Sequence, residues 1–389
     1  MRRAGIAPAP LSPRRLPRHR GLAAFLLLFA GLFGPRASWA DEPREPDVTA
    51  HTNATARTSE APSRFEPLLR ASLGSGYDGN VTFAPRGAVE DPLGFDGQGG
   101  AWFGTAGLTL GVGRSFDALR VDVSYDLYQT AYQAPFRASS FHQQALELRA
   151  SDPGYRLIGW ELALRGDLSF TGAGNLQPFQ RSGAIEPELV VGRRRPVRLR
   201  VGGQILALDT LDPELAYLSG HRLEARATPE LVLAGWRVSL PLRWRLDRTG
   251  NFRGPPLPMD PSECLDCTFR SVSPTRNQAW IGGLRLSTPF GWTVRPGLAA
   301  RFEHRNYLEA EHDLVEGPEG TERTRRRFRT DRRWWLEANL RVNLTESWSL
   351  VARYQLGQST TWLLGSGAGL ESRSYRRPVA LIELEADWM

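Results

Sequence analysis

The stretch Leu119-Arg120-Val121-Asp122-Val123-Ser124-Tyr125-Asp126-Leu127-Tyr128 decides the fold, because apolar and polar side chains alternate along it. Alternation with a period of two is typical of a β-strand whose two faces meet different surroundings. The same pattern recurs at 236–247, where Trp236, Val238, Leu240 and Leu242 share one face, and at 334–344. Each stretch is long enough to cross a membrane as a tilted strand of about 9–11 residues.

Counting such stretches along the whole chain predicts fourteen strands, with twelve or sixteen as the alternatives. We place them at 68–77, 102–112, 118–129, 141–150, 156–170, 183–192, 197–208, 221–233, 236–247, 277–286, 292–305, 334–344, 348–357 and 377–388. Prolines inside four of them, at Pro187, Pro229, Pro241 and Pro296, each remove a hydrogen-bond donor from the sheet. We therefore allow an error of one hairpin in the count.

The connections between these strands alternate between short turns and long polar loops. The long loops fall at 78–100, 130–140, 171–181, 209–220, 248–276, 306–330 and 358–376. An outer-membrane β-barrel has an even number of antiparallel strands, short periplasmic turns and longer external loops. A soluble sandwich gives no reason for two loop classes at its two ends. The sequence thus predicts an all-β, transmembrane, antiparallel up-and-down barrel over residues 68–389 in the bacterial outer membrane.

The first 67 residues differ from the rest of the chain. Residues 1–40 combine seven Arg and no acid with the apolar stretch 21–33, which predicts a cleaved signal peptide. Residues 41–67 are rich in Pro, Thr, Glu and Ala and predict a disordered periplasmic tether. Removing the seven leader Arg from the 49 basic residues leaves 42, which equals the 42 acids. Because the remaining chain is balanced, a nucleic-acid-binding surface is not expected.

Gly74-Ser75-Gly76-Tyr77-Asp78-Gly79-Asn80-Val81, in the first predicted strand, resembles the opening strand of several proteobacterial outer-membrane barrels. Among these are the fourteen-stranded barrel domains of surface lipoprotein assembly modifiers. This resemblance implies a barrel and, as one function, lipoprotein export. The ending Leu384-Glu385-Ala386-Asp387-Trp388-Met389 resembles the C-terminal signal that the barrel assembly machinery reads, which makes that machinery an expected partner.

Charged side chains crowd the polar face of the predicted strands, which is expected to line the lumen. Arg rows favour anions by their field and by two-pronged contact with carboxylate or phosphate. Pairing between Arg and acids on neighbouring strands is the alternative, and Arg outnumbers acids within 197–247. The candidate lumen residues are Arg165, Arg198, Arg200, Arg222, Arg226, Arg237, Arg243, Arg245, Arg285, Arg295, Arg301, Arg341, Arg353, Glu161, Glu188 and Glu224.

Two further features lie in the predicted external loops. The densest basic run, with Arg325, Arg326, Arg327 and Arg329, is a candidate anion-binding loop that would face the phosphates of lipopolysaccharide. The only two cysteines, Cys264 and Cys267, are expected to form a disulfide, because the compartment is oxidising and two further zinc ligands are missing.

The predicted function is a channel for polar solutes or polymers, without covalent chemistry, cofactor or metal. A closed barrel that acts through its long loops, in adhesion or in surface assembly and lipoprotein export, is the first alternative. A barrel hydrolase is the second. It would need a partner for His142, His221 or His304, which we expect at the lumen or rim, and no nucleophile–base motif surrounds them.

Overall fold

The computed structural model describes most of the chain from residue 65 onward. The described ranges are 65–81, 99–116, 119–134, 136–152, 157–171, 177–192, 196–211, 213–233, 236–253, 257–258, 268–288, 293–316, 322–365 and 368–388. The predicted signal peptide and Cys264 and Cys267 lie outside these residues, as does the predicted tether up to residue 64. The last three tether positions, 65–67, belong to the first strand and not to a disordered segment.

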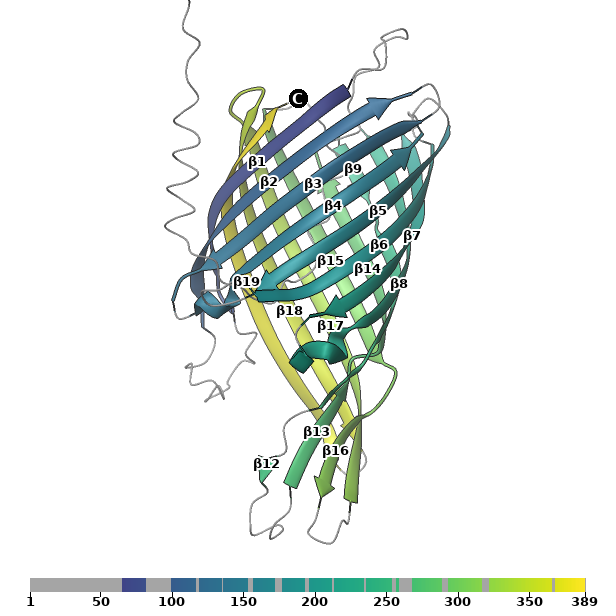
Figure 1. The fold of residues 1–389 in the computed structure, drawn as a ribbon, viewed down its shortest axis with the longest axis vertical. Coiled ribbons are helices and arrows are strands. Elements are labelled where there is room, and N and C mark those ends of the chain that lie inside the picture. The colour runs from purple at the N-terminus through teal and green to yellow at the C-terminus, as the bar shows by residue number, and fades with distance from the viewer. Residues whose placement is uncertain are drawn as a thin grey trace, which may run out of the picture. The chain divides into compact units, whose positions relative to one another are not determined.

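Fourteen antiparallel strands close into a barrel, as the alternation predicts (Figure 1). Their bounds are β1 Phe65–Asp78, β2 Ala101–Ser115, β3 Arg120–Tyr132, β4 Phe141–Ser151, β5 Ile158–Thr171, β6 Gln177–Val191, β7 Val197–Thr210, β8 Gly220–Leu233, β9 Trp236–Ser239 with β10 Leu242–Thr249, β14 Asn277–Ser287, β15 Val294–Tyr307, β17 Glu322–Asn343, β18 Trp348–Gly365 and β19 Ala368–Trp388. The last strand pairs with the first, from Leu69 opposite Trp388 to Asp78 opposite Val379. This pairing leaves the barrel without a free edge.

Two of the four prolines inside the predicted strands, Pro187 and Pro241, sit at irregular points of the sheet. Segments β9 and β10 form one barrel strand that is interrupted at Leu240 and Pro241, and both segments pair with β8 and β14. The Pro241 carbonyl still accepts a hydrogen bond from the Gly283 amide at 2.8 Å. Pro187 lies where the pairing of β6 with β7 is broken. At Pro187 and Pro241 the missing donors therefore fall where the ladder is interrupted, whereas Pro296 keeps a regular register opposite Leu340 on β17.

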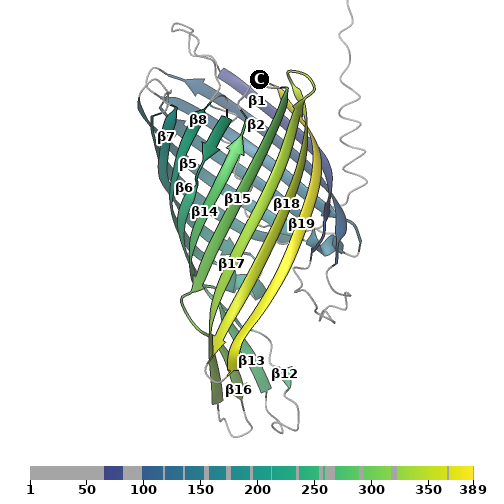
Figure 2. The same cartoon turned by 180° about the vertical axis from the view of Figure 1, so that it is seen from behind.

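The end with long connections extends well beyond the barrel. Strands β11 Asn251–Arg253, β12 Leu257–Pro258, β13 Thr268–Pro274 and β16 Glu311–Glu316 form within the predicted loops 248–276 and 306–330. Together β13, β16 and the distal parts of β17, β18 and β19 make one projecting sheet, called here the external sheet (Figures 1 and 2). Short 3₁₀ helices, η2 Phe136–Ser139 and η3 Pro213–Leu218, lie in two other long connections. The expectation of irregular loops at 306–330 and 358–376 was wrong.

The two faces of the wall differ sharply in chemistry. Large apolar side chains such as Leu162, Ile185 and Leu298 are exposed on the outward face, whereas Glu303 and Glu383 on the opposite face are each 1% exposed. Aromatic pairs mark the two borders of the apolar band: Trp348 and Trp388 at the end with short turns, with ring centroids 5.6 Å apart, and Tyr77 and Trp102 at the other, 5.4 Å apart. Apolar bands flanked by aromatic girdles are the lipid-facing surface of outer-membrane barrels, so the short turns are periplasmic.

Candidate functional site

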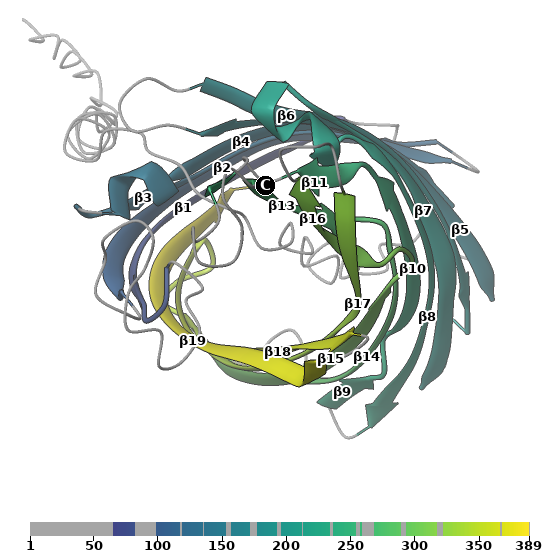
Figure 3. The ribbon, with the colours of Figure 1, turned by 90° about the horizontal axis from the view of Figure 1, so that it is seen from below.

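The candidate site is the inward face of the barrel, seen along the axis in Figure 3. All sixteen predicted lumen residues occupy register positions on this face, opposite in parity to the exposed apolar side chains. Their parity follows from the two-residue period of the strand, which the sequence already contains. Their partners depend on the register between strands, which the sequence does not reveal.

Strands β4 and β5 carry a paired, acid-rich part of the wall. Arg149 contacts Glu147 at 2.6 Å and Glu161 at 3.2 Å, so it bridges the two strands. Arg165 contacts Asp167 at 2.8 Å. These side chains are between 12% and 18% exposed, so the pairs are partly screened from water and each Arg has an acid as neighbour.

Part of the Arg excess within 197–247 is paired with acids that come from outside that range. Arg200 contacts Glu188 at 2.5 Å and Arg226 contacts Glu186 at 3.1 Å, both acids on β6. Of the two arrangements that the sequence left open for 197–247, these contacts favour pairing over a one-sided Arg wall. Arg200 and Arg226 of this range face acids on strand β6, which supplies Glu186 and Glu188.

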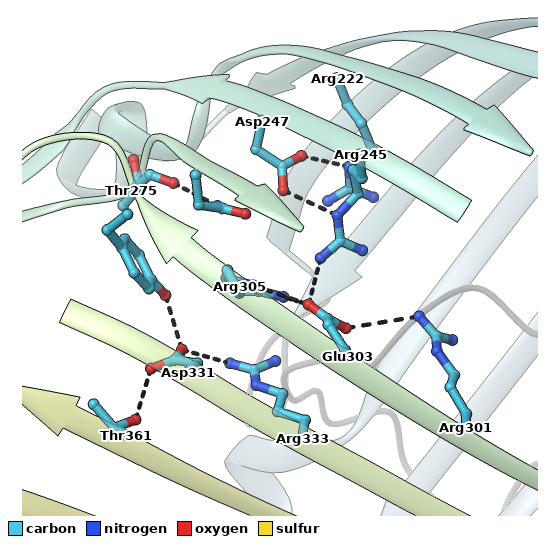
Figure 4. A network of polar contacts seen from close by, with 12 residues as sticks. Arg222, Arg245, Asp247, Thr275, Arg301, Glu303, Arg305, Asp331, Arg333 and Thr361 are labelled. Carbon is cyan, nitrogen blue, oxygen red and sulfur yellow. Dashed lines mark hydrogen bonds and ion pairs between the residues drawn. The ribbon is translucent and has the colours of Figure 1, made fainter. Parts of the chain in front are cut away.

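A dense buried network joins β10 and β15 (Figure 4). Glu303 accepts contacts from Arg245 at 2.8 Å and Arg305 at 2.6 Å, and Arg301 lies 3.7 Å from it. Arg245 also contacts Asp247 at 3.2 Å. Because buried ions are costly unless they are paired and hydrogen-bonded, this network fixes these strands in one arrangement.

A second network lies towards the external side on β17. Asp331, which is fully buried, contacts Arg329 at 3.0 Å and accepts hydrogen bonds from Tyr307 at 3.1 Å and Thr361 at 2.8 Å. Arg333 approaches the same carboxylate at 3.5 Å. The bonds tie β15, β17 and β18 together at the base of the external sheet.

Near the periplasmic mouth the inward face is dominated by arginine. Arg198, Arg237, Arg285, Arg295 and Arg341, called here the periplasmic arginine belt, lie one to three residues from the periplasmic ends of β7, β9, β14, β15 and β17. Arg295 lies directly opposite Arg341 in the register, a like-charge pairing that is ordinarily unfavourable. Arg295 donates to the Asn343 side chain at 2.7 Å, and Arg341 contacts Glu385. On the described parts of β7 to β17, this level of the inward face therefore carries more Arg than acid, while Glu385 on β19 contacts Arg341.

The predicted external anion-binding loop is not a loop. Arg325, Arg326, Arg327 and Arg329 all lie within β17, and the side chain of Arg325 is outside the described residues. Alternation separates the others: Arg326 is exposed on the outward face, whereas Arg327 and Arg329 point inward and lie 3.9 and 3.7 Å from Glu311. A basic run in a strand therefore splits between two faces.

The histidines lie on the outward face and not in the lumen. The His142 ring packs against Phe170, with centroids 5.4 Å apart, and its Nε2 lies 3.0 Å from the Gln144 amide. His221 and His304 share outward register positions with lipid-facing residues. Within the described part of the chain, no serine or carboxylate oxygen contacts these rings, and no group of three metal-ligating side chains gathers. Of the two expected placements, lumen or rim, the lumen was wrong: His142 and His221 lie near the external ends of β4 and β8.

No family model and no curated protein matches the sequence. The structure is similar to the outer membrane channel DcaP of Acinetobacter baumannii, with a TM-score of 0.44 and 8% identity over 85% of this chain and 99% of that one. It is also similar to an anion-selective porin from Comamonas acidovorans, with a TM-score of 0.40 and 8% identity over 84% and 100% of the two chains. Among the described residues, no helix is long and apolar enough to span a membrane.

Proposed function

We propose that this chain is an outer-membrane channel for polar solutes or polymers, with an Arg-lined lumen that favours anions. The mechanism is diffusion past fixed charges, without covalent chemistry or a cofactor. The lumen face supports this proposal, because its charged side chains are held by strands and not by loops.

One observation carries the anion preference: Arg295 stands opposite Arg341 within the periplasmic arginine belt. On the described parts of the strands β7 to β17, Glu230 is the only acid at that level of the inward face. Two guanidinium groups across one strand pair repel each other, and Glu385 on β19, which contacts Arg341, offsets part of that repulsion. A further anion beside Arg295 would relieve the rest. An anion passing the periplasmic mouth therefore meets a favourable field.

Many arginines elsewhere on the inward face form ion pairs with acids of the wall. Arg149, Arg200 and Arg245 all have an acid within 3.2 Å, which cancels most of their long-range field. Selectivity should therefore depend on the periplasmic arginine belt far more than on the total number of lumen arginines.

Single-channel recording of the refolded barrel in a planar bilayer tests the proposal. Under a salt gradient, the wild type should give stable open channels. Their reversal potential should have the sign that indicates higher permeability for anions than for cations. The variant Arg295→Gln/Arg341→Gln should move that potential towards zero. Arg181→Gln is the matched control, because Arg181 lies outside the lumen and pairs with Asp209 at 2.6 Å. A folded, inserted but silent barrel would overturn the proposal.

The external sheet favours a second candidate function, adhesion or surface assembly through the external end. Strands β17, β18 and β19 have 22, 18 and 21 residues, about twice the length that a tilted strand needs to cross the membrane. The resemblance of Gly74–Val81 to barrel domains of surface lipoprotein assembly modifiers belongs with this candidate. A silent barrel whose external sheet is required for surface display of a lipoprotein would support it.

A further inference from the structure

A row of cations stands on the outward face just outside the apolar band. On β17 the outward side chains run from Val342 through Leu340, Leu336 and Trp334, and the next outward side chain is Arg332. On β15 the corresponding step leads from Phe302 to His304, and on β19 from Pro378 to Arg376. Arg332 and Arg376, called here the outward cation row, thus each occupy the first outward position beyond the apolar band of their strand, and His304 does so on β15.

The register brings the row together with polar neighbours. His304 lies directly opposite Arg332, and Arg332 lies opposite Thr360 on β18. Arg376 on β19 lies opposite Gln358, one outward step closer to the membrane on β18. With adjacent strands about 5 Å apart and outward residues about 7 Å apart along a strand, all these groups fall within the span of one large lipid headgroup.

The electrostatics of the row are one-sided. Among the outward side chains that the structure describes beyond the apolar band of β14, β15, β17, β18 and β19, none is Asp or Glu. Arg332 and Arg376 are exposed, and the Arg332 guanidinium lies over the Trp362 ring, with its Cζ 4.8 Å from the centroid. A ring under a guanidinium orients it while leaving the N–H groups at its edge able to donate.

The chain also contains an outward arginine near the external end that does have an acid beside it. On β6 and β7, Arg181 occupies an outward position near the external end and has an acid beside it, Asp209, at 2.6 Å. That pair is exposed and locally neutral, so it offers little field to an external anion. The outward cation row differs because its positive charge is not matched on the same face.

We propose that the outward cation row binds the phosphate groups of lipopolysaccharide in the outer leaflet. Trp334, one step below Arg332, belongs to the aromatic level that sits at membrane headgroups, so the row stands where lipid phosphates lie. Arg and phosphate form short, charge-assisted and often two-pronged hydrogen bonds. This site faces the lipid and is independent of the channel function.

Binding of lipopolysaccharide to the purified, detergent-solubilised barrel tests this site. The wild type should retain phosphorylated lipopolysaccharide at least about tenfold more tightly than lipopolysaccharide from which the lipid A phosphates have been removed. Arg332→Gln/Arg376→Gln should lose about tenfold in affinity for the phosphorylated form and little for the dephosphorylated form. Raising the salt concentration should reduce the difference.

Arg181→Gln is the matched control, since it removes an outward, external Arg that already has an acid partner. Equal affinity of the wild type for the two lipids would overturn the proposal, and this comparison needs no variant to fold. A loss in Arg181→Gln as large as in the double variant would also overturn it, because the effect would then come from overall charge. Far-ultraviolet circular dichroism and unheated gel mobility establish that each variant is folded.

Discussion

Arg377 on β19 and Asp78 on β1 join the two ends of the barrel sequence across the closing seam, with the Arg377 Nη2 2.6 Å from the Asp78 Oδ2. Asp78 is fully buried, and it also accepts a hydrogen bond from the Tyr132 hydroxyl at 3.0 Å. Removing one partner of such a buried pair leaves an uncompensated charge. The seam between the first and last strands is therefore held by side chains as well as by backbone hydrogen bonds.

Arg377→Ala should lower the free energy of unfolding by about 3–5 kcal/mol, because Asp78 would stay buried without its cation. Arg181→Ala removes an exposed ion pair instead and should cost less than about 1 kcal/mol. Urea unfolding in detergent micelles, followed by tryptophan fluorescence, compares the two. Equal losses would show that the seam pair contributes no more than a surface pair.

Gly192→Ala should destabilise the barrel through the periplasmic turn between β6 and β7. Gly192 has φ of +77°, and an added Cβ would lie 2.4 Å from the Val197 carbonyl oxygen. We expect a loss of about 1–2 kcal/mol or more, from the left-handed backbone and the clash. Gly183→Ala is the control in the adjacent strand, since an added Cβ there meets nothing within 4 Å. A stable Gly192→Ala protein would mean that the turn rearranges freely.

Glu303→Gln should alter both stability and selectivity. The change removes the acid shared by Arg245 and Arg305 and leaves two close guanidinium groups without it. We expect a loss of about 3–5 kcal/mol in the free energy of unfolding. In the protein that still folds, we expect the reversal potential to shift in the direction that indicates a higher permeability for anions. Bilayer recording measures the second effect. An unchanged potential would show that the lumen field is insensitive to this network.

Trp348 and Trp388 should show an energetic coupling at the periplasmic border. Their rings meet edge to face, with an interplanar angle of 86°. A double-mutant cycle with alanine should give a coupling of about 0.5–1.5 kcal/mol. A second cycle that pairs Trp388 with Trp280, at the external side of β14, should give a value near zero. Coupling that is equal in both cycles would point to a general effect of losing tryptophan.

The strand number and the inward or outward direction of each side chain could be predicted from the sequence. Both depend only on the two-residue period, which is plain in segments such as Leu119–Tyr128 because lipid touches one face. The external strands β13 and β16 were missed because the two-residue period is visible only where the two faces of a strand meet different surroundings. Outside the membrane both faces meet water, so Glu311–Glu316 has no apolar alternation to reveal it.

The contacts of the site were less predictable than its residues. For Arg200 and Arg226 the sequence left open both an anion-attracting wall and pairing with acids, and their partners, Glu188 and Glu186, both lie on β6. Such pairings depend on the register, which is set by turns and long-range packing. The outward cation row was missed because Arg332 and Arg376 are far apart in the sequence, and only the strand register brings them within one outward step of each other.

The continuity of β17 with β18 has a mechanical consequence. Their pairing runs without interruption from Asn343 opposite Ser349, at the periplasmic border, to Arg327 opposite Gly365 in the external sheet. A ladder of backbone hydrogen bonds transmits displacement with little slack, unlike a hinged loop. A force that displaces the external sheet would therefore also displace Asp331 and Arg333 on the barrel wall. Through these strands, movement outside the cell would change the position of charged side chains in the lumen.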